Sequence, residues 1–202
     1  PMNVGVLALQ GDVREHFRVL EDCGVKATLV RRACEIEKVD ALIIPGGEST
    51  TIAHLARVFE VFDLIQERIA SGLAVYGSCA GMILLADRIL DSTKNQLTFG
   101  GLDITVRRNA IGRQVDSFEA DLEIPRVAVA PMRAVFIRAP WVEEVGPEVE
   151  VLATVQVSGG AYPVAVRQGR LLATSFHPEL TNDNRIHRYF LQEVCQMGMT
   201  IR

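Results

Sequence analysis

The chain has 202 residues, of which 49% are hydrophobic and 23% are charged; this composition excludes intrinsic disorder and predicts one globular domain over residues 1–202. Its net charge of -4 provides no basic excess for binding a phosphate backbone, so we expect no nucleic-acid partner. The longest apolar runs, Val4 to Leu9 and Ala80 to Ala86, are much shorter than the roughly 18 residues of a membrane helix. We therefore expect no membrane partner, no signal peptide and a cytoplasmic location.

Short apolar runs alternate with amphipathic segments in the first half of the chain, which is typical of βαβ units around a parallel sheet. The runs predict strands over Val4–Leu9, Lys26–Arg31, Ala41–Ile44 and Leu73–Tyr76. The amphipathic segments predict a helix over Asp12–Cys23 and a helix that begins at a Ser49 or Thr50 cap and includes Phe59. They also predict a second helical stretch to about Ala70 and a helix that begins near Met82.

The second half alternates polar and apolar residues instead. Asp103–Arg107 and Val149–Thr154 have the pattern of half-buried antiparallel strands, and Leu171–Phe176 that of a last buried strand. A closing helix places Ile186, Phe190, Val194 and Met197 on one face. The sequence therefore predicts a three-layer α/β fold, with an open, mixed, mostly parallel sheet and helices on both faces.

The segment Gly77-Ser-Cys-Ala-Gly81 joins a predicted buried strand to a predicted helix. This G-x-C-x-G pattern is the thiol counterpart of a nucleophile elbow, a sharp turn that exposes the central side chain at the start of a helix. Helix N-termini favour the thiolate form of cysteine. Cys79 is therefore our candidate nucleophile. The remaining cysteines, Cys23, Cys34 and Cys195, are expected to be free structural thiols, since no C-x-x-C pair indicates a metal site.

A cysteine nucleophile requires a base and a group that orients the base. His177-Pro178-Glu179 offers both, because alternate residues of an extended chain project to the same side. We expect His16, His54 and His187, which lie on predicted helices, at the surface.

Two glycines, Gly46 and Gly47, follow another strand and precede Glu48-Ser49. Glycine allows the backbone to approach a substrate closely and to direct an N–H group at a developing oxyanion. Because this strand end lies at the carboxyl edge of the sheet, where ligands bind in open α/β folds, we expect the turn to serve the same site as Cys79. A plain strand-to-helix turn with a Ser/Thr cap is the alternative, and no phosphate-binding glycine motif is present.

Six segments in this order resemble the class I glutamine amidotransferases, and within them the glutaminase subunits of pyridoxal 5'-phosphate synthase. They are Gly5-Val-Leu-Ala-Leu-Gln-Gly11, Pro45-Gly-Gly-Glu-Ser-Thr-Thr51, Gly77-Ser-Cys-Ala-Gly-Met82, Arg108-Asn109 with Gly112-Arg-Gln-Val-Asp-Ser-Phe-Glu119, Val135-Phe-Ile-Arg-Ala-Pro140 and Ser175-Phe-His-Pro-Glu-Leu-Thr181. The resemblance covers nearly the whole chain and implies a flavodoxin-like core.

The resemblance implies that Cys79 attacks the side-chain amide of L-glutamine, with His177 as acid and base and Glu179 orienting it. It implies an oxyanion hole from the N–H groups of Gly47 and Ala80. The implied glutamine-binding residues are Gly47, Glu48, Ser49, Arg108, Ile137 and Arg138, with Arg107 as an alternative to Arg108.

The resemblance also implies a macromolecular partner. Gln10 matches a position that faces a synthase subunit, a (β/α)8 barrel that receives the ammonia. Neither a metal nor another cofactor is expected. A cysteine peptidase, a γ-glutamyl hydrolase or a redox sensor remains an alternative, and ammonia release from free glutamine separates these from a glutaminase.

Overall fold

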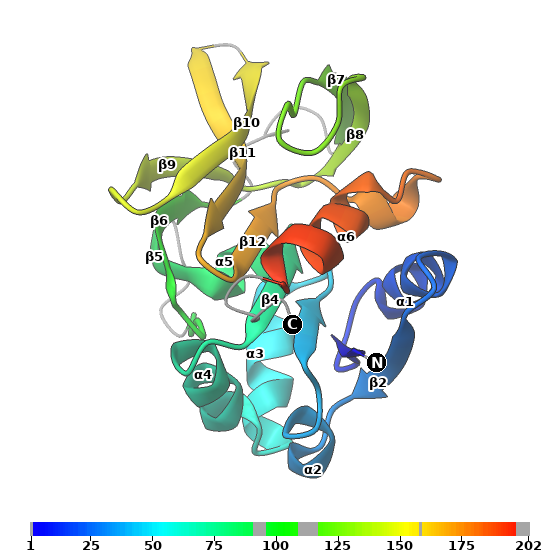
Figure 1. Ribbon diagram of the computed structural model, residues 1–202. Coiled ribbons are helices and arrows are strands. Elements are labelled where there is room, and N and C mark those ends of the chain that lie inside the picture. The colour runs from blue at the N-terminus through cyan, green and yellow to red at the C-terminus, as the bar shows by residue number, and fades with distance from the viewer. Residues whose placement is uncertain (1, 91–95, 109–116, 158, 197–202) are drawn as a thin grey trace.

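The computed structural model describes residues 2–90, 96–108, 117–157 and 159–196, and its centre is a seven-stranded sheet (Figure 1). In spatial order the strands are β10 (Glu150–Val157), β11 (Gly160–Gln168), β12 (Leu171–Thr174), β4 (Ala74–Ser78), β3 (Ala41–Ile44), β1 (Asn3–Leu7) and β2 (Lys26–Val30). The five strands from β12 to β2 are parallel, whereas β11 is antiparallel to both of its neighbours.

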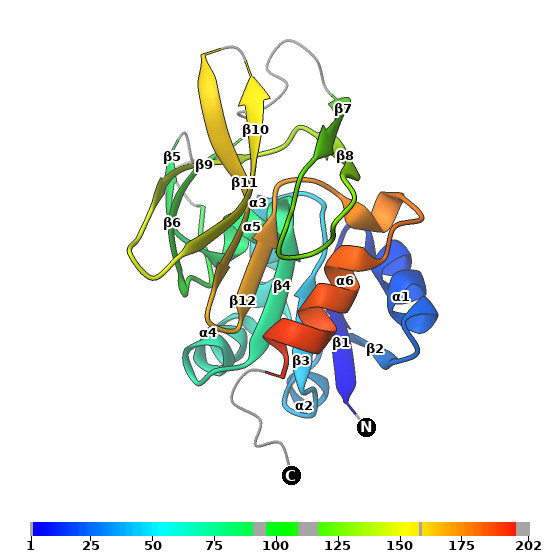
Figure 2. The ribbon, with the colours of Figure 1, turned by 45° about the horizontal axis from the view of Figure 1, so that its top comes forward.

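Helices cover both faces of this sheet, as Figure 2 shows for α1 and α6 on the near side. The helices are α1 (Val13–Asp22), α2 (Ala33–Ile36), α3 (Ser49–Val58), α4 (Phe62–Ala70), α5 (Ala80–Leu85) and α6 (Arg185–Tyr189), which continues as a π-helical turn, Phe190–Val194. The predicted three-layer α/β fold with a mixed, mostly parallel sheet is confirmed.

Alternating residues of the central strands divide the core into two layers. Leu42 and Ile44 of β3 pack with α2 to α5, whereas Ala41 and Ile43 pack with α1 and α6. Every residue of β3 is buried, which explains why it is a continuous apolar run in the sequence.

The predicted elements of the first half are present, with shifted ends. Strand β4 continues through Ser78, and α5 begins at Ala80 rather than near Met82. The cap of α3 is Glu48, not Ser49 or Thr50, because its carboxylate accepts hydrogen bonds from the N–H groups of Thr50 and Thr51.

The second half contains strands that the sequence did not predict. They are β11 of the main sheet; β5 (Ala86–Leu90) and β9 (Trp141–Val145), which flank β6 (Leu102–Arg107); and the hairpin of β7 (Ser117–Leu122) and β8 (Met132–Ile137). A short 3-10 turn, Pro178–Leu180, follows β12. Met197 and residues 109–116 lie outside the described part of the chain. Among the described helices, none has the length and apolar character needed to span a membrane.

Candidate active site

Four adjacent parallel strands deliver the candidate residues to one edge of the sheet. The carboxyl ends of β12, β4, β3 and β1 lead in this order to His177, Cys79, Gly47 and the loop of Gln10. Ligands of open α/β folds bind at this edge. Segments more than 160 residues apart in sequence therefore converge on one site.

Cys79 occupies a strained turn between β4 and α5, with φ 53° and ψ -100°. A positive φ is rare for a residue with a side chain and marks stored strain. Glycines make the turn sterically feasible: a Cβ at Gly77 would lie 2.5 Å from the Gly81 backbone, and one at Gly81 would lie 2.4 Å from the Ile44 carbonyl oxygen. The turn thus has the geometry expected of a nucleophile elbow, although Cys79 is only 6% exposed rather than open to solvent.

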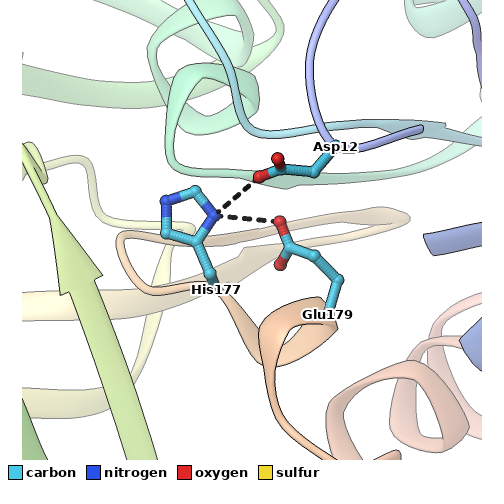
Figure 3. Close-up of side chains that lie close together, drawn as sticks. All are labelled: Asp12, His177 and Glu179. Atoms are coloured by element: carbon cyan, nitrogen blue, oxygen red, sulfur yellow. Dashed lines mark hydrogen bonds and ion pairs between the residues drawn. The ribbon is translucent and has the colours of Figure 1, made fainter. Parts of the chain in front are cut away.

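His177 lies beside this thiol, with its Nδ1 turned towards two carboxylates (Figure 3). Nδ1 is 2.9 Å from Glu179 Oε2 and 3.3 Å from Asp12 Oδ2. The backbone N–H of His177 donates to the Val135 carbonyl oxygen at 2.9 Å, which fixes the loop after β12 against β8. Since Nδ1 is occupied, Nε2 is the ring atom left for the thiol.

The charges around His177 favour the imidazolium. Burial lowers its pKa, but hydrogen bonds with the two carboxylates and Cys79 outweigh burial and raise the pKa to about 12. Burial raises the pKa of Glu179, but the neighbouring His16 and His177 rings hold it well below its ordinary value. The site therefore combines an ionised orienting carboxylate with a readily protonated base.

Asp12 is a site residue that sequence reasoning missed. It occupies the N-cap position of α1 but makes no capping hydrogen bond with its side chain, which lies against His177 instead. Asp12, His177 and Glu179 have potential ligand atoms within 4.8 Å of one another, a spacing compatible with a metal ion. A shared Nδ1–H accounts for the same spacing, and a metal would require that nitrogen to be deprotonated.

The Gly46–Gly47 turn lies directly against the His177 ring. A Cβ at Gly46 would lie 2.4 Å from His177 Cε1. The Asp12 N–H donates to the Gly46 carbonyl oxygen at 2.8 Å, so the N–H of Gly47 points away from the loop before α1 in this trans peptide. Ala80 is the first residue of α5, where backbone N–H groups have no partner within the helix.

A cavity of about 390 Å³ lies over the elbow, within the usual range for small-molecule sites. Its walls contain every predicted site residue except Glu179, which is buried behind His177. The lining residues from the prediction are Gln10, Gly47, Glu48, Ser49, Cys79, Ala80, Arg108, Ile137, Arg138 and His177, joined by Asp12, Ile83 and Leu180.

Arg108 and Glu48 meet at one side of the cavity, where Arg108 Nη2 lies 3.3 Å from Glu48 Oε1. Burial raises the pKa of Glu48, but hydrogen bonds from Thr50 and Thr51 outweigh it and lower the pKa. Arg108 Nε is buried and has no hydrogen-bond partner among the described residues. Arg107, by contrast, donates from Nε to Glu143 at 2.6 Å, and it is not among the cavity-lining residues.

Three further predicted residues enclose the cavity. Gln10 is half-buried, and its side-chain oxygen accepts a hydrogen bond from the Glu48 N–H at 2.9 Å. The end of β8 contributes Ile137, whose carbonyl oxygen lies 3.7 Å from the Cys79 sulfur. Arg138 follows with a φ of 46°, a second strained residue at the rim.

The surface location expected for His16 and His187 is wrong. Both are fully buried, whereas His54 is exposed as predicted. His16 Nε2 lies 3.3 Å from Glu179 Oε2, so the first helix contacts the orienting carboxylate. His16 lies three residues after Val13 and four before Leu20, a spacing that places it on the apolar face and could have indicated its burial.

The other cysteines are free thiols, as predicted, but they differ in exposure. Cys195 is buried, Cys23 is half-buried and Cys34 is exposed. Burial raises the pKa of Cys195 to about 12, with Arg170 opposing it. Cys34 is therefore not the buried structural thiol that its residue type suggested.

Comparison with known proteins places this chain in a family. The model of the SNO glutamine amidotransferase family matches residues 6–196. The chain belongs to this family. It is 62% identical to pyridoxal 5'-phosphate synthase subunit PdxT of Kineococcus radiotolerans over 95% of this chain and 94% of that protein. It is 59% identical to the subunit of the same name from Rhodococcus jostii, over 95% and 96% of the two chains.

Solved structures agree with the family assignment. A crystal structure of a glutamine amidotransferase is 49% identical, with a TM-score of 0.86 over 96% of this chain and 99% of that one. PurLQS from Thermotoga maritima shares the fold at 15% identity, with a TM-score of 0.68 over 95% and 97% of the two chains.

Proposed function

We propose that this chain is the glutaminase subunit of a pyridoxal 5'-phosphate synthase and that residues 1–202 act as one glutaminase domain. It hydrolyses L-glutamine to L-glutamate and ammonia through a thioester on Cys79. The observation that carries the proposal is the strained Cys79 elbow beside the His177–Glu179 pair in one cavity. The names of the relatives, together with the single family match over residues 6–196, support it further.

The chemistry follows from the positions of these groups. The Cys79 sulfur attacks the side-chain amide carbon while His177, as the imidazolium, holds the proton from the sulfur on Nε2. The oxyanion accepts hydrogen bonds from the N–H groups of Gly47 and Ala80. His177 returns its proton to the amide nitrogen, the carbon–nitrogen bond breaks, and ammonia leaves. Water then attacks the thioester and gives a proton to His177, the carbon–sulfur bond breaks, and glutamate departs.

The walls of the cavity account for recognition of the amino acid. Arg108 is the residue that we assign to the substrate α-carboxylate, because its buried Nε has no partner among the described residues. Glu48 binds Nη2 of the same guanidinium while it caps α3. Ser49, Ile137 and Arg138 complete the proposed glutamine site.

A synthase subunit with a (β/α)8 barrel is the proposed partner and ammonia acceptor. Gln10, the proposed partner-facing residue, also hydrogen-bonds the Glu48 N–H within the cavity. A contact at Gln10 would therefore reach the glutamine site directly. We expect substitutions of Gln10 to affect the KM for glutamine as well as stimulation by the partner.

Ammonia release tests the proposal. The purified chain is assayed with L-glutamine, a γ-glutamyl peptide and an unmodified peptide, each with and without its synthase subunit. We expect ammonia to be released from L-glutamine but from neither peptide, and we expect the synthase subunit to increase the rate. Cleavage of either peptide at a higher kcat/KM than glutamine would replace the proposal with a peptidase or a γ-glutamyl hydrolase.

A further inference from the structure

Two histidines outside the proposed mechanism form a buried chain behind Glu179. His187 Nε2 lies 2.9 Å from His16 Nδ1, and both side chains are fully buried. His16 Nε2 lies 3.1 Å from Ser78 Oγ and 3.3 Å from Glu179 Oε2. Helices α1 and α6 are thus linked to the active-site carboxylate through two imidazole rings.

Hydrogen-bond accounting fixes the proton of His16. An ionised carboxylate is only an acceptor, so each group around Glu179 Oε2 must present a hydrogen. Ser78 Oγ lies 3.3 Å from that oxygen and donates to it, which leaves the hydroxyl as an acceptor for His16. His16 therefore carries its proton on Nε2.

His187, at the far end of the histidine chain, fixes the direction of the hydrogen bonds. His187 Nδ1 is buried with no hydrogen-bond partner among the described residues. A proton on His16 Nδ1 would force the His187 proton onto this orphaned nitrogen, and buried N–H groups without an acceptor are rare in folded proteins. With both rings neutral and protonated on Nε2, the only group without a partner is the lone pair of His187 Nδ1, among the described atoms of the two rings. Burial lowers the pKa of His187 to about 3, which agrees with a neutral ring.

We propose that His16 and His187 are positioning residues whose hydrogen bonds all run towards Glu179. In this direction His16 donates to Glu179 Oε2, and that hydrogen bond stabilises the ionised carboxylate. His177 must then hold a proton on Nδ1, which leaves Nε2 to exchange protons with Cys79. The role in catalysis rests on the proposed glutaminase function, whereas the proton assignment does not.

Removal of His16 has a consequence for pH dependence. Glu179 is buried, and burial by itself raises the pKa of its carboxyl group. Loss of one hydrogen-bond donor to the ionised form should therefore raise this pKa. The titratable and charged groups that face this cluster are Asp12 from the loop before α1, His16 from α1, Tyr76 and Cys79 from β4 and the elbow, His177, and His187 from α6.

The proton assignment can be read from the intact protein without any variant. Long-range ¹H–¹⁵N NMR reports the tautomer and charge of each histidine, with exposed His54 as an internal reference. We expect His16 and His187 each to carry one ring proton, on Nε2, near neutral pH. A proton on His187 Nδ1 or on His16 Nδ1 would overturn the inference.

Kinetics of the full chain with its synthase tests the positioning role. His16→Leu removes the donor, and we expect kcat to fall about tenfold or more. In the pH profile of kcat/KM, the acidic limb should move up by about one pH unit, while the KM for glutamine stays within about twofold of the wild-type value. His16→Gln retains an N–H donor and should restore most of the activity. His54→Leu serves as the surface control.

The outcomes separate the two proposals. Equal losses in His16→Leu and His16→Gln with an unmoved acidic limb would show a packing role and overturn this inference, and the glutaminase function would stand. A wild-type chain without glutaminase activity would overturn the proposed function, while the NMR result would still decide the direction of the histidine chain.

Discussion

Replacing Gly46 by alanine places a methyl group against the His177 ring. The new Cβ would lie 2.4 Å from Cε1 and 2.7 Å from Nδ1. Carbon atoms in ordinary contact are at least about 3.5 Å apart, so the ring must move by roughly 1 Å. The backbone itself tolerates alanine, because Gly46 is not among the glycines with positive φ.

A displacement of about 1 Å at a reacting group costs on the order of a hundredfold in rate. We therefore expect Gly46→Ala to lower kcat for ammonia release from L-glutamine about a hundredfold, measured with the synthase present. The melting temperature should change little. The methyl group cannot avoid the ring by shifting towards Asp12, because Asp12 Oδ2 lies 3.0 Å from the same Cβ position.

Gly24→Ala is the matched control. Gly24 has a φ of +78° and nothing within 4 Å of its Cβ position, so alanine adds backbone strain of about 1–2 kcal/mol far from the site. It should lower stability and leave kcat unchanged. A Gly46→Ala protein with kcat within about twofold of wild type would refute the argument that the position of His177 controls the rate.

Three further predictions concern substrate binding, reactivity and pH. Arg108→Ala should raise KM for glutamine about ten- to a hundredfold, the effect of one charge-assisted hydrogen bond, whereas Arg107→Ala should not; the reverse result in initial-rate assays would move the carboxylate to Arg107. Peptide mapping after iodoacetamide treatment should show that glutamine protects Cys79 but not exposed Cys34, and an absence of protection at Cys79 would remove it from the glutamine site. His177, with its pKa raised from 6.5 to about 12, contributes stability that is complete below pH 6.5 and declines as pH rises towards 12. In urea unfolding, the difference between wild type and His177→Gln should thus be larger at pH 6 than at pH 9, and an equal or larger difference at pH 9 would contradict the assigned charge.

Local sequence patterns indicated which residues meet at the centre of the candidate site. The elbow needs small residues at fixed positions around Cys79, and the His-x-Glu pair follows a strand end, so both are visible in a single segment. The parallel core was predictable for a similar reason, since strands buried on both faces, such as β3, are continuous apolar runs.

The supporting residues were harder to predict because their roles depend on contacts between distant segments. Asp12 looks like an ordinary helix cap, and only the fold brings His177 within 3.3 Å of it. His16 and His187 lie 171 residues apart and meet only when α1 and α6 pack on the same face of the sheet. The strands of the second half were missed where half-buried patterns are short and interrupted, as in β7 and β9.

The central claim is that Cys79 forms a covalent bond to the glutamyl group of glutamine. Acid-quenched reactions of the chain with its synthase and L-glutamine, followed by mass spectrometry and peptide mapping, test this claim directly. We expect a glutamyl adduct on Cys79, and neither adduct nor ammonia release in Cys79→Ala. An adduct on another cysteine, or glutamine turnover by Cys79→Ala at the wild-type rate, would contradict the account.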